Sequence, residues 1–123
     1  MSTQRPLFEP PKEWNPPQSL PDLSDAKEIA IDLETYDPGI KDTGPGWATN
    51  RGHVVGIAIA VDGFKGYYPL RHEGGGNFDE DALRKQLKKY FENDSDKIFH
   101  NASYDVGWLK NWGINCKGKI IDT

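Results

Sequence analysis

The 123-residue chain is predicted to fold as an α/β domain, because segments with strand periodicity alternate with segments with helix periodicity. Residues 29–33 alternate apolar side chains in the manner of a buried strand, and residues 54–70 hold two further apolar runs. Residues 79–91 and 101–112 instead place apolar side chains at helical spacing. A content of 36% hydrophobic and 28% charged residues is typical of one ordinary soluble globular domain.

The composition narrows the function classes. No apolar run approaches the length of a membrane span, and the start does not resemble a signal peptide. The single Cys116 excludes an internal disulfide framework, fits a reducing cytoplasm and has no evident partner histidine. The three histidines have no second His or Cys at zinc-ligand spacing. A net charge of −4 gives no overall attraction to nucleic acid, although a bound metal could supply local positive charge.

Proline divides the chain into an arm and a domain. Residues 1–22 hold six of the nine prolines, and proline removes backbone donors and favours extended chain. We therefore predict a Pro-rich arm or tether over residues 1–22, and a domain over residues 23–123.

The first predicted strand ends in two carboxylates. Ile29, Ile31 and Leu33 point to one face of the strand, whereas Asp32 and Glu34 point to the other. Residues two apart on a strand have Cα atoms ~6.6 Å apart. Burying two such carboxylates without compensation is costly, and a divalent metal would remove the cost. The alternative is a strand that ends in a solvated Asp-Leu-Glu turn.

A Gly- and Pro-rich loop over residues 36–52 is expected next. Trp47, near Arg51, either folds onto the core or stands on a flexible lip where its indole could stack a nucleotide base. A near-continuous apolar strand over residues 54–61, an Asp-Gly turn and a returning strand over residues 64–70 then complete a three-strand meander.

The next predicted element is a helix with Asp79 as its N-cap. Its apolar face comprises Leu83, Leu87, Tyr90 and Phe91. The lysines near its C-terminus form either a solvated face or, as the less favoured interpretation, a contact with DNA.

A short strand over residues 97–100 leads into a second helix. Asn101 is its predicted N-cap, which places Asp105 one turn inside, and Gly113 ends it. Asp105 could serve only as a carboxylate near a helix N-terminus, or it could join a metal site. Residues 119–122 form the last predicted strand.

Together, these motifs resemble a known family. IAIDLET at residues 29–35, HNASYDVGWLKNWGI at residues 100–114 and KGKIIDT at residues 117–123 are similar to the 3′–5′ proofreading exonuclease domain of family A DNA polymerases. That domain belongs to the DEDD exonucleases. The resemblance covers roughly residues 26–123. It implies a ribonuclease-H-like fold, with a mixed five-stranded sheet and flanking helices.

The resemblance also implies a mechanism, two-metal hydrolysis of nucleotides from a single-stranded DNA 3′ end. Asp32 would bridge two Mg²⁺ or Mn²⁺ ions, Glu34 would hold the first ion with its attacking water, and Asp105 would hold the second. The expected substrate contacts are Leu33, Thr35, Asn101 and Tyr104. The expected location is the cytoplasm of a bacterial or phage-infected cell.

The family's third motif, a Tyr or His and a final Asp on a later helix, has no counterpart before Thr123. We therefore expect a truncated exonuclease domain, whose partners are the missing C-terminal exonuclease segment and a polymerase domain. The chain alone should be a weak or inactive nuclease. Two alternatives are a catalytically dead nucleic-acid-binding or scaffold fragment, and a structural fragment that self-associates through an exposed apolar sheet face.

Overall fold

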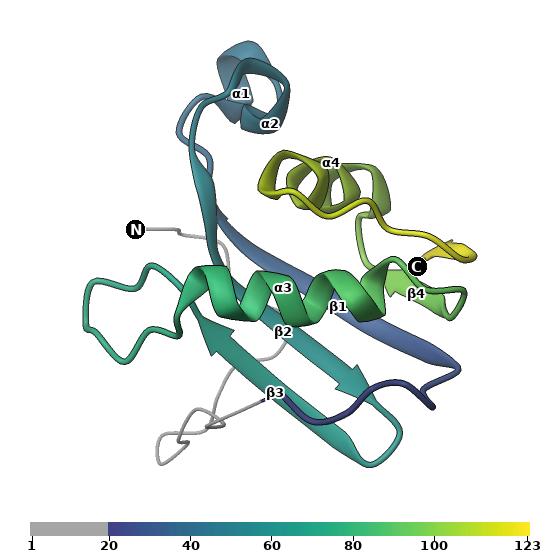
Figure 1. The fold of residues 1–123 in the computed structure, drawn as a ribbon. Coiled ribbons are helices and arrows are strands. Elements are labelled where there is room, and N and C mark those ends of the chain that lie inside the picture. The colour runs from purple at the N-terminus through teal and green to yellow at the C-terminus, as the bar shows by residue number, and fades with distance from the viewer. Residues whose placement is uncertain (1–19) are drawn as a thin grey trace.

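The computed structural model describes residues 20–123, so most of the predicted Pro-rich arm lies outside the described residues (Figure 1). The described part is an α/β domain in which strands and helices alternate along the chain. Its elements are β1 (Glu28–Tyr36), α1 (Ile40–Thr43), α2 (Gly46–Thr49), β2 (His53–Val61), β3 (Phe64–Pro69), α3 (Glu80–Phe91), β4 (Asp96–Phe99), α4 (Ala102–Trp112) and β5 (Ile120–Asp122).

The strands form one mixed five-stranded sheet in the order β3-β2-β1-β4-β5. Strands β1, β2 and β3 are the predicted antiparallel meander, with Asp62 and Gly63 at the hairpin between β2 and β3. Strand β4 lies parallel to the other edge of β1, and β5 lies parallel to β4. This arrangement confirms the predicted α/β class and is consistent with a ribonuclease-H-like fold.

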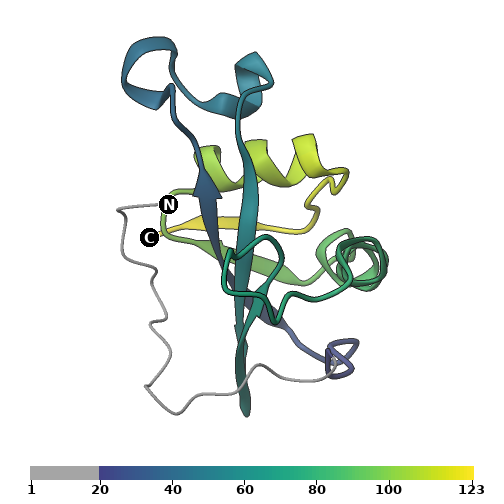
Figure 2. The same cartoon turned by 90° about the vertical axis from the view of Figure 1, so that its left-hand side faces the viewer.

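The two faces of the sheet differ in their cover. Ile29, Ile31 and Leu33 are buried on one face of β1, and the intervening residues are only half-buried, as the alternation predicted. Both long helices, α3 and α4, extend to the same side of β1 and β2 (Figure 2). Their buried side chains, among them Leu87, Phe91, Trp108 and Leu109, complete the hydrophobic core with that face. Asp32 and Glu34 therefore lie on the sheet face opposite the two helices.

The residues predicted at the ends of α3 and α4 occupy the expected positions, but one of them lacks the expected hydrogen bond. Asp79 caps α3 by accepting a hydrogen bond from the Ala82 N–H at 3.2 Å, and Gly113 ends α4 in the left-handed conformation with φ of 105°. Asn101 occupies the N-cap position of α4, as predicted, but its side chain makes no capping hydrogen bond. Asp122 from β5 instead accepts the Ala102 N–H at 3.2 Å.

The connection between β1 and β2 is more regular than the predicted loop, since it contains the short helices α1 and α2 above α4 (Figure 1). Trp47 of α2 packs on Gly107 of α4 so closely that a Cβ atom at Gly107 would overlap the indole ring. The interpretation of Trp47 as a packing residue is thereby confirmed, because its indole already covers α4.

Lys97 of β4 is completely buried. Its Nζ donates to the carbonyl oxygens of Asn93, Ser95 and Lys117 at 2.7–2.9 Å, and to the Asn93 side chain at 3.0 Å. This ammonium group ties the loop before β4 to the loop before β5.

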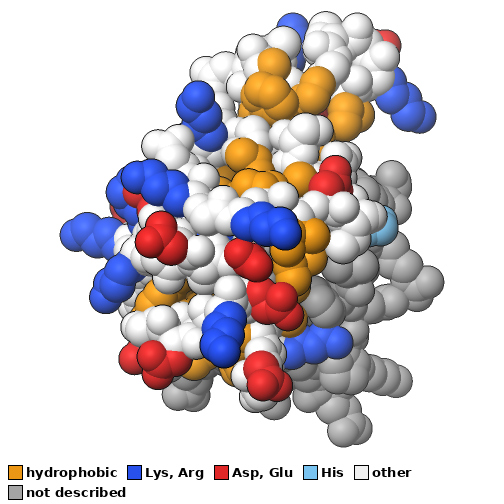
Figure 3. Space-filling view, turned by 90° about the vertical axis from the view of Figure 1, so that its right-hand side faces the viewer, with side chains coloured by type: hydrophobic (Ala, Val, Ile, Leu, Met, Phe, Trp, Pro, Cys, Tyr) orange, Lys and Arg blue, Asp and Glu red, His pale blue; other side chains and the backbone are white. Residues whose placement is uncertain are grey.

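No helix within residues 20–123 is long and apolar enough to cross a membrane. On the side of the molecule shown in Figure 3, Lys and Arg side chains are interspersed with Asp and Glu side chains. That face therefore offers no continuous basic surface of the kind that binds nucleic acid through charge alone.

Candidate active site

The site forms where β1 extends beyond its neighbour β4. Strand β1 pairs with β4 only over residues 28–30, so the rest of that edge of β1 is not covered by β4. The chain turns from β4 into α4 at this place, which brings the first turn of α4 against the exposed edge of β1. Open α/β sheets commonly bind ligands at the carboxyl ends of two adjacent parallel strands whose following connections run to opposite sides. Strands β1 and β4 are such a pair, because the chain continues from β1 to β2 on one side and from β4 to β5 on the other.

Asp105, in the first turn of α4, reaches this edge and is 4% exposed. Burial, and then the negative charge of Asp32, raise the pKa of Asp105 from its ordinary value of 3.8 to about 7. A hydrogen bond from the Leu33 backbone N–H acts in the opposite direction, and the charge of Asp122 adds to the rise in pKa. The fold thus brings together Asp32 and Asp105, two of the three predicted metal ligands.

Glu34, the third predicted ligand, is held by a tyrosine from β3. The Tyr67 hydroxyl donates to Glu34 Oε2 at 2.8 Å and lies 2.6 Å from His72 Nε2. His72 Nε2 is itself 3.9 Å from Glu34 Oε2. Burial, followed by the hydrogen bond and charge of Glu34, raises the pKa of Tyr67, so its hydroxyl remains protonated and able to donate.

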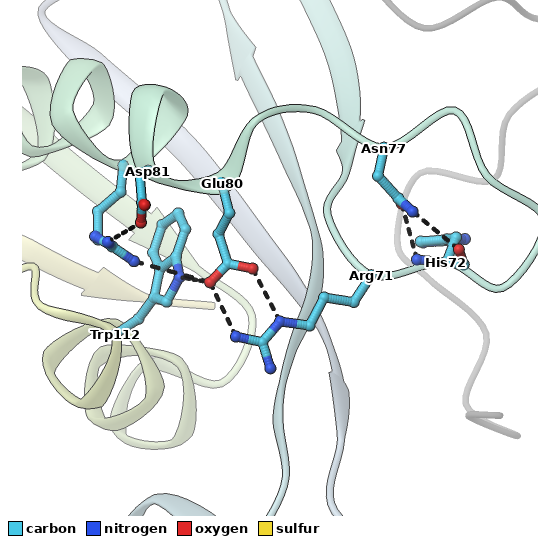
Figure 4. A network of polar contacts seen from close by, with 7 residues as sticks. Arg71, His72, Asn77, Glu80, Asp81 and Trp112 are labelled. Atoms are coloured by element: carbon cyan, nitrogen blue, oxygen red, sulfur yellow. Dashed lines mark hydrogen bonds and ion pairs between the residues drawn. The ribbon is translucent and has the colours of Figure 1, made fainter.

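The loop that carries His72 is anchored at both ends (Figure 4). Arg71 forms a bidentate pair with Glu80 of α3, at 2.9 and 3.0 Å, and Trp112 Nε1 donates to the same carboxylate at 3.0 Å. The Asn77 side chain accepts from the His72 N–H at 2.8 Å and donates to the His72 carbonyl oxygen at 2.9 Å. These bonds restrict the positions that the His72 ring can take beside Tyr67.

The four residues predicted to contact the substrate differ in their exposure to solvent. The side chains of Leu33 and Thr35 point to the helix-covered face and are each 9% exposed, whereas Asn101 is exposed. The Tyr104 hydroxyl oxygen lies 2.9 Å from Thr35 Oγ1, and the hydroxyl donates a hydrogen bond to Asp37 Oδ2 at 2.8 Å. Tyr104 and Thr35 therefore bind each other and fasten α4 to the end of β1.

A cleft of about 770 Å³ adjoins Glu34 on the side away from Asp105. Its lining includes Tyr36, His53, Arg71 and His72. The rings of Tyr36 and His53 lie 5.4 Å apart, and Tyr36 is 42% exposed. Within residues 20–123, no group of three or more His, Cys, Asp or Glu side chains is arranged so that it could hold a metal ion.

Sequence reasoning missed Tyr67, His72 and Asp122. Tyr67 and Glu34 belong to strands that do not touch, so only the register of β2 between them shows that they meet. The contact of Asp122 with α4 depends in the same way on β5 lying beside β4. The one available signal was the alternation within residues 64–69, which places Tyr67 on the same face of the sheet as Asp32 and Glu34.

Two comparisons with known proteins bear on this site. No family model matches the chain. Over 120 residues the chain is 38% identical to a DNA-directed DNA polymerase of Pseudomonas phage M6, a match that covers 90% of this chain and 18% of that protein. The chain is therefore similar to one segment of a phage polymerase and spans less than a fifth of its length.

Proposed function

We propose that the chain is a proofreading 3′–5′ exonuclease module, related to a DNA polymerase, that hydrolyses nucleotides from a single-stranded DNA 3′ end with divalent cations. The observation that carries the proposal is the approach of Asp32 and Asp105, from a strand end and a helix start, at one edge of the sheet. The similarity to a phage DNA polymerase supports DNA as the substrate.

The carboxylates suit a hard divalent cation. Asp105 carries a raised pKa because it is buried beside the charge of Asp32, and a cation between the two would remove that repulsion. Asp32 and Asp105 would hold Mg²⁺ or Mn²⁺. Glu34, on the same strand face as Asp32, is bonded to Tyr67 and forms no group of three with them among residues 20–123, so it would have to turn from Tyr67 to supply a third carboxylate. When bound, such ions supply an activated water and stabilise the leaving 3′ oxygen.

The remaining residues would bind and orient the DNA. The cleft beside Glu34 offers the rings of Tyr36 and His53 for stacking on a base. The backbone of residues 33–35 borders the carboxylates, where it could contact the terminal nucleotide. Stacking and backbone contacts favour single strands without selecting a sequence.

Electron paramagnetic resonance titration with Mn²⁺ tests the metal site directly. We expect the 123-residue chain to bind Mn²⁺ at millimolar concentration, and D32N and D105N each to lose that binding. D25N is the matched control, because Asp25 is an exposed carboxylate in the turn before β1. Binding that is absent from the wild type, or equal in D32N and wild type, would overturn the proposal.

The substrate is tested by the affinity of the chain for linear and circular single-stranded DNA of the same sequence. We expect Mn²⁺ to strengthen binding of the linear strand, which has a 3′ end, and to leave the circular strand unaffected. Any nucleotide release should begin at the 3′ end and disappear in D32N. DNA binding that is identical for both strands and unchanged by Asp32→Ala would instead indicate a nucleic-acid-binding fragment without catalysis.

A further inference from the structure

A row of apolar side chains crosses the face of the sheet opposite α3 and α4. Ala30 of β1 pairs with Ala60 of β2 on one side and with Ile98 of β4 on the other, and Ile98 pairs with Ile121 of β5. Residues that pair across strands share a face, and Ala30 shares the face of Asp32, so these four side chains form one apolar row. All four are half-buried, and both long helices lie on the other side of the sheet (Figure 2).

A cleft of about 920 Å³ joins the apolar row to the place where the described chain begins. Its lining includes three members of the row, Ala30, Ala60 and Ile98. It also includes Asp22 and Leu23, which follow closely on residue 20, the first residue that the structure describes. Residues 1–19 are therefore attached to the domain beside this cleft.

The sequence of residues 1–19 suits a sheet face better than a sheet edge. The segment contains five prolines and the apolar side chains of Leu7, Phe8 and Trp14. Proline has no N–H to donate, so a Pro-rich segment is a poor extra strand, but its rings and apolar neighbours can pack on an apolar surface. An extended Pro-rich segment of this length spans ~59 Å at ~3.1 Å per residue, whereas the four strands of the row span only ~14 Å.

We propose that residues 1–19 dock in this cleft and lie across the apolar row, so that the chain covers this face of its own sheet. Attachment beside the cleft gives the segment an effective concentration in the millimolar range, so weak contacts suffice to hold it. A second copy of the chain fits less well. Asp25, Glu28 and Asp62 also line the cleft, and two copies that met through this face would bring these like charges together. The inference does not depend on the proposed exonuclease activity.

The test is paramagnetic relaxation in the full chain, with a nitroxide attached to Gln4→Cys in a C116A background. Cys116 is the only cysteine of the chain, so the label has one site. We expect the amide NMR signals of the apolar row to lose most of their intensity. The signals of Leu87 in α3 and Leu109 in α4, which lie behind the sheet, should lose clearly less.

Two matched substitutions test the contact itself. A60E places a charge in the apolar row and should restore the intensity of the row signals. A82E makes the same change at an exposed position of α3 and should leave the loss in place. If A60E does not fold, as judged by circular dichroism, L7S/F8S/W14S decides, because it changes only the segment: restored intensities support the proposal, and unchanged intensities overturn it.

The remaining outcomes are equally decisive. A loss of signal that is equal at the apolar row and at Leu87, or greater at Leu87, would overturn the proposal. A mixture of spin-labelled chain with isotope-labelled chain that carries no nitroxide tests the second copy. Row signals that weaken as much in this mixture as in the singly labelled chain would show that another molecule covers the face, and would also overturn the proposal.

Discussion

Replacing Asp105 by asparagine should stabilise the metal-free protein at neutral and alkaline pH. The rise in the pKa of Asp105 from 3.8 to about 7 corresponds to about 4 kcal/mol of unfavourable free energy for holding its charged form in the folded state. The amide of D105N carries no charge, but it remains buried, and an imperfectly paired buried amide costs about 1–2 kcal/mol. The expected net gain in the free energy of unfolding is therefore about 2–3 kcal/mol at pH 8.

The gain should depend on pH in a direction set by proton binding. Between pH 3.8 and about 7, folded Asp105 retains a proton that the unfolded chain releases, so the stability of the wild type falls as pH rises through this range. The amide side chain of D105N has no such proton to retain. D105N should therefore have no advantage near pH 4, where only the cost of its buried amide remains, gain an advantage towards pH 7 and keep it above that pH.

Urea unfolding monitored by circular dichroism, at pH 4.5 and at pH 8 in the presence of a chelator, measures both quantities. D25N is again the control, since it removes an exposed carboxylate. Added Mn²⁺ should reverse the order at pH 8, because ligand binding stabilises only the protein that keeps Asp105. A D105N protein that is folded but no more stable than wild type at pH 8 would refute the electrostatic reasoning.

Three further substitutions test how the fold supports the site. K97M leaves buried carbonyl oxygens without their donor, so we expect a loss of about 2–4 kcal/mol in urea unfolding. G107A forces Trp47 away from α4 and should cost about 1–2 kcal/mol despite the better helix propensity of alanine, with a visible change in Trp fluorescence. E80Q weakens the pair with Arg71 and should cost about 1 kcal/mol at pH 7. The ion pair lowers the pKa of Glu80, so the difference between E80Q and wild type should shrink as pH falls below 4.5, the ordinary value for glutamate.

The features that the sequence predicts correctly are those set by local periodicity. Alternation over residues 29–35 places Asp32 and Glu34 on one face of β1, and the spacing of Leu83, Leu87 and Phe91 gives the buried face of α3. Both patterns are properties of a single element and do not depend on its neighbours. The Asp-Gly turn likewise sets the β2–β3 hairpin by itself.

The contacts that could not be predicted from the sequence depend on which helices and strands become neighbours in the fold. Asn101 has the right residue type and position for a cap, yet Asp122 takes the Ala102 N–H because β5 lies close to the start of α4. Whether the Trp47 indole would face solvent or a helix depended on Gly107, more than fifty residues later, leaving room for it. No periodicity carries such information, because it arises from the packing of separate segments.

The two buried charged residues in the described part of the chain, Lys97 and Asp105, differ in the charges that surround them. Lys97 is completely buried, but oxygen acceptors surround its ammonium group. Asp105 is nearly as buried as Lys97, yet two of the charges acting on it, those of Asp32 and Asp122, have the same sign as its own. Folding alone favours opposite charges around a buried carboxylate, so like charges there oppose stability. Such an arrangement is typical of a functional site, and here it would be relieved by a divalent cation.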